Sequence, residues 1–173
     1  MPAYTVVKGD LLDAKEELIL QQNNCVSVRP HGLSKAIAHR FPYADPYILR
    51  RAIGTRNMAI DEDRPIPGSI HVFSPPVGES GPAFVSLFAQ YGMGRPYAYN
   101  NSGSDAHPDS HEDRLRWFES CLDMVASLQP KSVAMPYNIG CGLAGGNWAE
   151  YEPVIDRWAM SHPDMDVVLY HLV

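Results

Sequence analysis

Residues 132–148 decide the predicted fold, and they read SVAMPYNIGCGLAGGNW. The stretch begins with the apolar run Val133-Ala134-Met135 between chain breakers, which is typical of a strand buried on both faces. Residues 140–146 follow, and four of these seven residues are glycine. Asn147 predicts the cap of a following helix, with Glu150 in the reciprocal capping position. Because glycine permits positive φ angles and close backbone approach, strand, loop and helix together can aim several N–H groups at one point.

The glycine loop, residues 140–146, has two interpretations. Converging N–H groups at a helix N-terminus suit a phosphate or pyrophosphate. The alternative is a tight strand-to-helix turn that needs glycine for packing alone, but the density of glycines favours anion binding. No Lys-Ser or Lys-Thr follows the loop, and GCGLAGG does not match G-x-G-x-x-G. The loop therefore predicts a ligand that carries a diphosphate, in a protein that is neither a kinase nor a Rossmann dehydrogenase.

Length and composition indicate one globular domain over residues 1–173. Hydrophobic residues make up 45% of the chain and charged residues 20%, a composition without the bias of disordered or collagen-like chains. The net charge of -6 argues against a basic groove that follows a nucleic acid, so nucleic acid is not an expected partner. A local basic patch is the alternative, since one region contains Lys35, His39, Arg40, Arg50, Arg51 and Arg56.

The cysteines and the apolar runs bound the cellular setting. Cys25, Cys121 and Cys141 show neither paired nor metal-type spacing, which indicates reduced thiols. The N-terminus lacks a signal-peptide pattern, and no apolar run is long enough to span a bilayer. We expect a cytoplasmic monomer with no membrane partner.

Strand and helix patterns alternate along the chain. Strands are expected at residues 4–7, 17–22, 69–73, 83–90, 133–135 and 166–172. Helices are expected at 34–41 with Ser34 as its cap, at 45–53, after Ser110 and at 148–160. Ser110 and Asp113 have the spacing of a capping box, whereas residues 91–109 form a long irregular stretch that is typical of a functional or mobile loop. This alternation predicts an α/β domain with a mixed, mainly parallel sheet.

Polar residues follow four of the predicted strands. They are Gly9-Asp10, Asn23-Asn24, Gln90-Tyr91 and residues 138–144. Ligand sites in open α/β sheets lie outside the carboxyl ends of the strands. The sequence therefore predicts that these four segments line one cleft.

These segments, in this order, resemble a macrodomain, the ADP-ribose-binding fold with three α/β/α layers. The matching residues are KGDLL at 8–12, Asn23-Asn24, IGCGL at 139–143 and GGNW at 145–148. The last two elements are the most specific, and they are similar to the branch that holds ADP-ribose-1″-phosphate phosphatases and glycohydrolases that remove ADP-ribose from acidic side chains. Residues 87–94 (LFAQYGMG) are similar to the phosphatase side. The resemblance covers essentially the whole chain.

The resemblance implies ADP-ribose or an ADP-ribosylated substrate as the partner, with no cofactor and no metal. Asp10 would accept a hydrogen bond from the adenine amino group beside the Leu11 N–H, and Asn24 would hold the distal ribose. An exposed turn aspartate and a strand-end turn are the plain alternatives for Asp10 and Asn24. The residues expected to bind the ligand are Asp10, Leu11, Asn24, Gly32, Tyr91, Asn138, Ile139, Gly140, Cys141, Gly142, Leu143 and Ala144.

The sequence departs from the family at three positions. The first loop reads RPHGLS at 29–34 and keeps one glycine, Gly32. Ala144 stands where the glycohydrolase branch has an aspartate, and Gln90 stands where it has a lysine. A lysine nucleophile supported by a carboxylate is therefore not expected.

His31, Asn24 and Gln90 are the catalytic candidates that this pattern leaves. Cleavage at the distal ribose needs a positioned water and a proton carrier, and His31 in the first loop is the best general acid or base. A surface histidine is the alternative. Cys141 lies near a helix N-terminus, which lowers thiol pKa, but a small packing residue is the preferred interpretation. Arg95 and Tyr97 are placed where they could close over the ligand.

The remaining clusters have plainer interpretations. Residues 105–113 contain histidines and carboxylates, but the preferred interpretation is a solvated acidic loop with a helix cap rather than a metal site. Trp117, Trp148 and Trp158 are expected in the core. The predicted function is a hydrolase that acts at the distal ribose of ADP-ribose derivatives, either a 1″-phosphate phosphatase or an enzyme that removes ADP-ribosyl or acyl esters. A non-catalytic ADP-ribose reader is the alternative.

Overall fold

One six-stranded sheet organises the chain, for which the computed structural model describes residues 1–97 and 107–172. The strand order is β1-β6-β5-β2-β4-β3, and every pair is parallel except β3 with β4. The strands are β1 (Thr5–Lys8), β2 (Leu18–Gln22), β3 (Ile70–Phe73), β4 (Ala83–Leu87), β5 (Ser132–Pro136) and β6 (Asp166–His171). The prediction of a mixed, mainly parallel sheet is confirmed.

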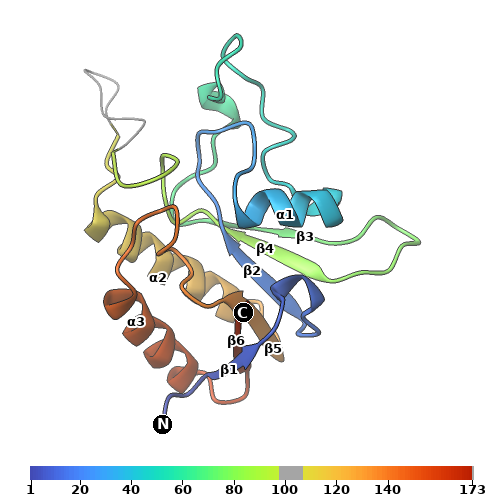
Figure 1. Ribbon diagram of the computed structural model, residues 1–173, viewed down its shortest axis with the longest axis vertical. Coiled ribbons are helices and arrows are strands. Elements are labelled where there is room, and N and C mark those ends of the chain that lie inside the picture. The colour runs from blue at the N-terminus through green and yellow to red at the C-terminus, as the bar shows by residue number, and fades with distance from the viewer. Residues whose placement is uncertain (98–106, 173) are drawn as a thin grey trace.

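Helices cover both faces of this sheet (Figure 1). Helices α2 (His111–Ser127) and α3 (Trp148–Ser161) pack on one face, and α1 (Leu33–Arg40) packs on the other. Short 3-10 helices η1 (Leu11–Asp13) and η2 (Pro42–Ala44) lie on the α1 side, while η3 (Asp61–Asp63) contributes no buried residue. The predicted three layers are therefore present.

The central strands are buried on both faces, as expected for residues 133–135. Val133 and Met135 belong to the core between the sheet and α2 and α3, whereas Ala134 belongs to the core on the α1 side. Ile19 and Leu20, which are consecutive in β2, divide in the same way and are both fully buried. Alternating side chains of one buried strand thus serve two cores.

The two long helices begin where the sequence predicts. Ser110 Oγ accepts a hydrogen bond from Asp113 N (3.0 Å), and Asp113 Oδ2 accepts one from Ser110 N (3.0 Å), which completes the capping box of α2. Asn147 Oδ1 accepts from Ala149 N (3.0 Å) at the start of α3. All three tryptophans pack in or against the larger core, as expected. None of the described helices is both long enough and apolar enough to cross a membrane.

The helix predicted at residues 45–53 is wrong. The segment is irregular, because its polar groups bond to other parts of the chain. The Tyr47 hydroxyl accepts from Asn24 N (3.1 Å), and the Arg50 guanidinium donates to the carbonyls of residues 24 and 27. A short bridge between Ala52 and Ala59 then turns the chain back on itself. These tertiary contacts outweigh the local helical preference.

Ser34 does not cap α1. The helix begins one residue earlier, at Leu33, and Ser34 Oγ bonds instead to the N–H and carbonyl of His31 (3.1 and 2.8 Å). The strand expected to run to Gln90 ends at Leu87, although the next three residues are also buried. The chain thus leaves the sheet early and is still enclosed where it enters the loop.

Three arginines of the basic patch are not free on the surface. Arg50 is buried, Arg40 pairs with Asp13 (2.8 Å), and Arg51 pairs with Asp63 (2.9 Å). Lys35 and Arg56 are exposed.

Candidate functional site

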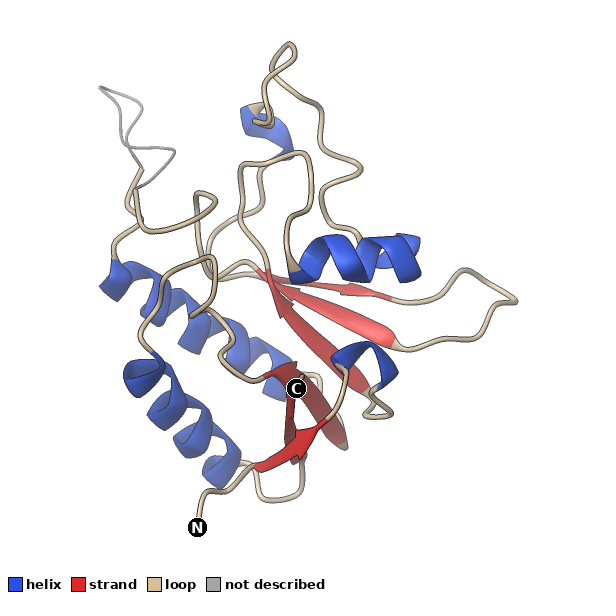
Figure 2. Ribbon diagram, viewed as in Figure 1, coloured by secondary structure: helices blue, strands red, loops and turns tan. Residues whose placement is uncertain are grey.

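A cavity of about 760 Å³ lies at the carboxyl ends of β2, β4 and β5. The loops that follow these strands gather beyond the arrow tips of β2 and β4 (Figure 2). Ten of the predicted site residues line the cavity: Asn24, His31, Gly32, Gln90, Asn138, Ile139, Gly140, Gly142, Leu143 and Ala144. Three of the four predicted strand ends therefore meet in one place.

Four predicted site residues do not line this cavity: Asp10, Leu11, Tyr91 and Cys141. Asp10 caps η1 by accepting from Leu12 N (2.9 Å), and Leu11 is buried in the core on the α1 side. Both follow β1, which is separated from β5 by β6. Their role at an adenine ring stays a prediction.

The sequence did not predict several of the residues that line the cavity: Gln22, Leu33, Ser34, Tyr47, Met93, Gly94, Pro136 and Tyr137. Gln22 carried a usable signal, because it ends a predicted strand immediately before Asn23-Asn24. Tyr47 carried none, since its segment was assigned to a helix. Arg95, expected near the ligand from its position, does line the cavity, whereas Tyr97 does not.

The glycine loop leaves backbone donors unused. In the described part of the chain, the N–H groups of Gly140, Gly142, Leu143 and Ala144 meet no acceptor, while Cys141 N donates to Asn138 O (2.9 Å). All four residues line the cavity. A row of free N–H groups at a cavity wall can satisfy phosphate oxygens.

Gly140 fits only because it lacks a side chain. Its φ angle is 77°, and a Cβ atom there would lie 2.8 Å from the Tyr151 ring and 3.0 Å from Gln22 Oε1. Tyr151 is buried beneath the loop and cannot move aside easily. The loop can therefore approach the core closely and turn its backbone towards the cavity.

A buried ion pair supports this wall from behind. Arg114 Nε donates to Asp109 Oδ1 (2.8 Å) and Nη2 donates to Oδ2 (2.7 Å), a bidentate pair in which both side chains are at most 2% exposed. The same carboxylate accepts from the N–H groups of Tyr91 and Gly92 (2.9 and 3.0 Å). Asp109 therefore anchors the start of the loop that follows β4.

Arg114 joins that loop to the glycine loop. Its Nη1 donates to Gly94 O (2.7 Å) and to Ala144 O (3.2 Å). One buried guanidinium thus fixes the backbones of two lining segments that are 50 residues apart in sequence. This arrangement corrects the prediction of a wholly solvated acidic loop at 105–113: residues 105 and 106 lie outside the described residues, but Asp109 is buried.

A different set of contacts holds residues 24–27, which lead from β2 into the first loop. Asn24 Oδ1 accepts from the N–H groups of Val26 (3.0 Å) and Ser27 (2.8 Å). Arg50 donates to Asn24 O and Ser27 O (both 2.9 Å), and its guanidinium lies 4.6 Å from the Tyr47 ring centroid. Burial lowers the pKa of Arg50. Since the Asn24 oxygen is engaged by backbone, its Nδ2 group is the part that can serve a ligand.

Two glutamines form the floor of the cavity. Gln90 Nε2 donates to Gly92 O (2.9 Å), and Gln22 Nε2 donates to Gln90 Oε1 (2.9 Å). The carbonyl at Gly92 accepts only, so it sets the orientation of both amides. Both polar atoms of Gln90 are engaged by protein, which suits a positioning residue better than a proton carrier.

The ionisable groups at the cavity are few. Among the described residues that line it there is no aspartate, glutamate or lysine, and the titratable or charged side chains are His31, Tyr47, Arg95 and Tyr137. His31 is exposed at the rim. Burial raises the pKa of Cys141 to about 11, helped by Glu150, so this thiol is not an activated nucleophile. No group of metal-binding side chains occurs in the described residues.

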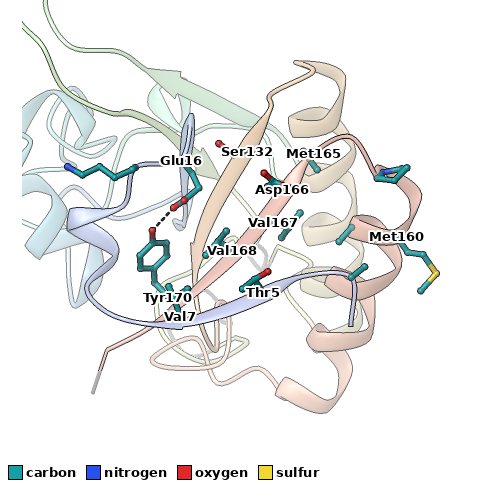
Figure 3. Close-up of a pocket in the computed structure, with 14 residues that line it drawn as sticks. Thr5, Val7, Glu16, Ser132, Met160, Met165, Asp166, Val167, Val168 and Tyr170 are labelled. Carbon is teal, nitrogen blue, oxygen red and sulfur yellow. Dashed lines mark hydrogen bonds between the residues drawn. The ribbon is translucent and has the colours of Figure 1, made fainter. Parts of the chain in front are cut away.

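A second cavity, of about 800 Å³, runs along β1 and β6 (Figure 3). Its lining includes Lys15, Glu16 and Asp166, and none of the predicted site residues. The Tyr170 hydroxyl donates to Glu16 Oε1 (2.5 Å), the contact drawn as a dashed line in Figure 3. The Glu16 carboxylate is thus already bonded within the protein, the charges of the lining are mixed, and the cavity at the carboxyl ends of the strands remains the candidate site.

Solved structures with a similar fold are macrodomains. The macrodomain of Mycobacterium tuberculosis DarG has a TM-score of 0.66 and 20% identity, with 96% of this chain and 96% of that chain covered. The macrodomain of Thermus aquaticus DarG has a TM-score of 0.65 and 19% identity, over 96% and 97% of the two chains. The Oceanobacillus iheyensis macrodomain with ADP has a TM-score of 0.61 and 13% identity, over 97% and 82%.

The sequence comparisons add no relative. No protein-family model matches the chain, and no curated protein matches it. The similarity is therefore one of fold alone. The chain has the three-layer α/β/α fold of macrodomains.

Proposed function

We propose that this cavity binds ADP-ribose, either free or attached to a second molecule. The observation that carries the proposal is the set of unused N–H groups at Gly140, Gly142, Leu143 and Ala144. They offer several donors to a diphosphate, and no carboxylate competes for them among the described lining residues. A macrodomain of the same fold, from Oceanobacillus iheyensis, was solved with ADP, which shares its adenosine diphosphate part with ADP-ribose. Adenine would then extend from the glycine loop towards Asp10.

We further propose hydrolysis at the distal ribose, of a 1″-phosphate or of an ADP-ribosyl or acyl ester. His31 would carry the proton, because it is the only histidine that lines the cavity among the described residues. Asn24 Nδ2 would hold a ribose hydroxyl, while Gln90 would position the cavity floor through Gly92. No metal takes part in this scheme.

A non-catalytic reader is the second candidate. The observation in its favour is the missing aspartate, glutamate and lysine among the described lining residues. With no carboxylate to activate water, turnover rests on one exposed imidazole. Binding without turnover needs only the backbone donors.

Binding is tested by calorimetric titration of the chain with ADP-ribose. Heat that fits a single site would support the proposal. No heat at a protein concentration of about 100 μM would contradict it. The Kd would then be weaker than about 1 mM, which corresponds to a binding free energy of less than about 4 kcal/mol.

Turnover is tested with ADP-ribose-1″-phosphate and with acetyl- and glutamyl-ADP-ribose. We expect His31→Ala to lower kcat roughly 100- to 10,000-fold, the contribution of a positioned acid or base, and to leave ADP-ribose affinity nearly unchanged. His39→Ala is the matched control, since His39 is also exposed on the α1 side and does not line the cavity. If the unaltered chain binds ADP-ribose but turns over none of the three substrates, the reader function stands instead.

A further inference from the structure

Arg95 is a cation beside the glycine loop for which the described residues supply no counter-ion. It lines the cavity, is exposed, and forms no ion pair with any described residue. It is also the only arginine or lysine among the described lining residues. In a chain with a net charge of -6, an arginine that pairs with no described residue, in a cavity whose described lining has no carboxylate, marks a place for a negative ligand.

The side chain of Arg95 is held against the glycine loop. A Cβ atom at Gly145 would lie 2.8 Å from Arg95 Cγ and 3.6 Å from Arg95 Cδ, so the arginine stem occupies the space that this glycine leaves. Gly145 has a φ angle of 74°. The absence of a side chain at Gly145 therefore serves the placement of Arg95 as well as the turn.

The backbone before Arg95 is fixed as well. The carbonyl of Gly94 accepts from Arg114 Nη1 (2.7 Å), and the carbonyl of Ala144, just before Gly145, accepts from the same atom (3.2 Å). Arg95 and the free N–H groups thus belong to two segments that a buried ion pair locks together. The stem of Arg95 and the backbone before it are thus already placed, so less ordering would be needed when a ligand binds.

We propose that Arg95 is the counter-ion of the diphosphate and sets the charge selectivity of the site. The inference rests on the proposed function, and it narrows the ligand class to molecules with two linked phosphates. A guanidinium can bind two phosphate oxygens at once, whereas the backbone N–H groups carry no formal charge. Adenosine monophosphate, with one phosphate, uses less of this pair of features than ADP or ADP-ribose does.

The test is calorimetric titration of ADP-ribose at two salt concentrations, about 50 and 300 mM, against the unaltered chain, Arg95→Gln, Arg95→Lys and Arg56→Gln. Arg56 is exposed and does not line the cavity, so Arg56→Gln makes the same change in net charge away from the site. We expect Arg95→Gln to weaken binding roughly 10- to 100-fold at low salt, the range for a hydrogen bond to a charged group. Arg95→Lys should recover part of that loss, and Arg56→Gln should stay within about twofold.

Salt dependence separates a charge effect from a structural one. The unaltered chain should bind more weakly as salt rises, and Arg95→Gln should lose most of this dependence. An Arg95→Gln affinity within threefold of the unaltered chain would overturn the inference, as would a weakened affinity with an unchanged salt dependence. Thermal unfolding of each variant shows whether the fold is intact.

Inorganic pyrophosphate is the second probe, and it separates this inference from the proposed function. If the chain binds pyrophosphate in an Arg95-dependent way but not ADP-ribose, Arg95 keeps its role and the proposed function fails. If ADP-ribose binds and Arg95→Gln has no effect, the proposed function stands and this inference fails. If neither probe binds, both fail.

Discussion

The two walls of the cavity are each held by a buried arginine, but the two arginines are satisfied in different ways. Arg114, behind the glycine loop, forms a bidentate pair with Asp109. Arg50, behind the first loop, is bonded to two backbone carbonyls and lies over the Tyr47 ring, and no described carboxylate pairs with it. The wall formed by the first loop is thus built around a cation that no described carboxylate balances, and the wall formed by the glycine loop around a neutral pair.

The difference follows from what each wall must hold. The glycine loop contains residues at positive φ, such as Gly140 and Gly145, and several of its N–H groups meet no acceptor among the described residues, so its backbone needs an external support. Arg114 supplies that support only because Asp109 balances its charge. The segment that leads into the first loop is held by a local turn, in which Asn24 Oδ1 accepts from the N–H groups of residues 26 and 27. Arg50 adds carbonyl contacts to this backbone, which is already folded. The glycine loop is therefore supported by a side chain from another element, whereas the wall formed by the first loop is held largely by its own local hydrogen bonds.

The largest effect is expected from Arg114→Met. The substitution removes one partner of the buried bidentate pair with Asp109, which is expected to cost about 3–5 kcal/mol of unfolding free energy. Arg50→Met removes a cation that has no described carboxylate partner. It should lower the free energy of unfolding by about 1–3 kcal/mol, through lost hydrogen bonds. Urea unfolding followed by tryptophan fluorescence measures both.

The double variant Asp109→Asn with Arg114→Met is the control for this contrast. The double variant removes both charges of the buried pair, so it should be more stable than Arg114→Met alone. Equal losses for Arg114→Met and Arg50→Met would show that the two walls are not held differently.

A smaller effect is expected from Gly140→Ala. The new methyl group would lie 2.8 Å from the buried Tyr151 ring at a φ angle of 77°, so strain and crowding should together cost about 2–4 kcal/mol. Gly54→Ala is the matched control, because Gly54 also has a positive φ of 58° but no atom within 4 Å of the added carbon. That variant should lose only about 1 kcal/mol, the cost of the backbone conformation.

The same urea experiment measures both glycine variants. If Gly140→Ala is as stable as Gly54→Ala, the glycine loop is not pressed against the core in the way described. ADP-ribose binding should fall in Gly140→Ala and stay unchanged in Gly54→Ala.

The smallest effect is a loss of stability at alkaline pH, to which the buried thiol of Cys25 contributes. Burial raises the pKa of Cys25 to about 12, so the folded state keeps this thiol protonated after the unfolded chain has begun to ionise. The contribution of the Cys25 thiol to the free energy of unfolding is fully present below its unfolded pKa, near about 8.5. It is lost as pH rises from there through the folded pKa. By pH 9.5 the cost from this one thiol is about 1 kcal/mol.

Cys25→Ala tests the assignment. The variant should be less stable at neutral pH, because it leaves a small void, yet its stability should fall less steeply between pH 8 and 9.5. A slope identical to that of the unaltered chain would show that Cys25 does not ionise on unfolding in this range.

Local patterns predicted the parts of the fold that local physics controls. The run Val133-Ala134-Met135 has no polar residue, so a strand buried on both faces was the only satisfactory placement. Ser110 and Asp113 satisfy each other within one helical turn, and this pairing needs no information from elsewhere in the chain. The same reasoning failed at residues 45–53, where Arg50 and Tyr47 bond to the first loop instead of forming a helix.

The candidate site was predictable at the level of strand ends and not at the level of side-chain partners. The rule for parallel sheets was sufficient to bring Asn24, Gln90 and Gly140 to one cavity. It could not show that Gln22 and Gln90, 68 residues apart, share a hydrogen bond that orients both amides. Nor could it distinguish Asp109 from the acidic residues around it.

The sequence by itself determined the order of strands and helices, the glycine loop and the residues that end at the sheet's carboxyl edge, because these depend on hydrophobic period, capping and backbone freedom over a few residues. Only the tertiary structure decided which arginine is buried, which carboxylate balances it and which cation is left facing the cavity. A charge is free or paired according to groups distant in sequence, and burial fixes the free energy of that choice.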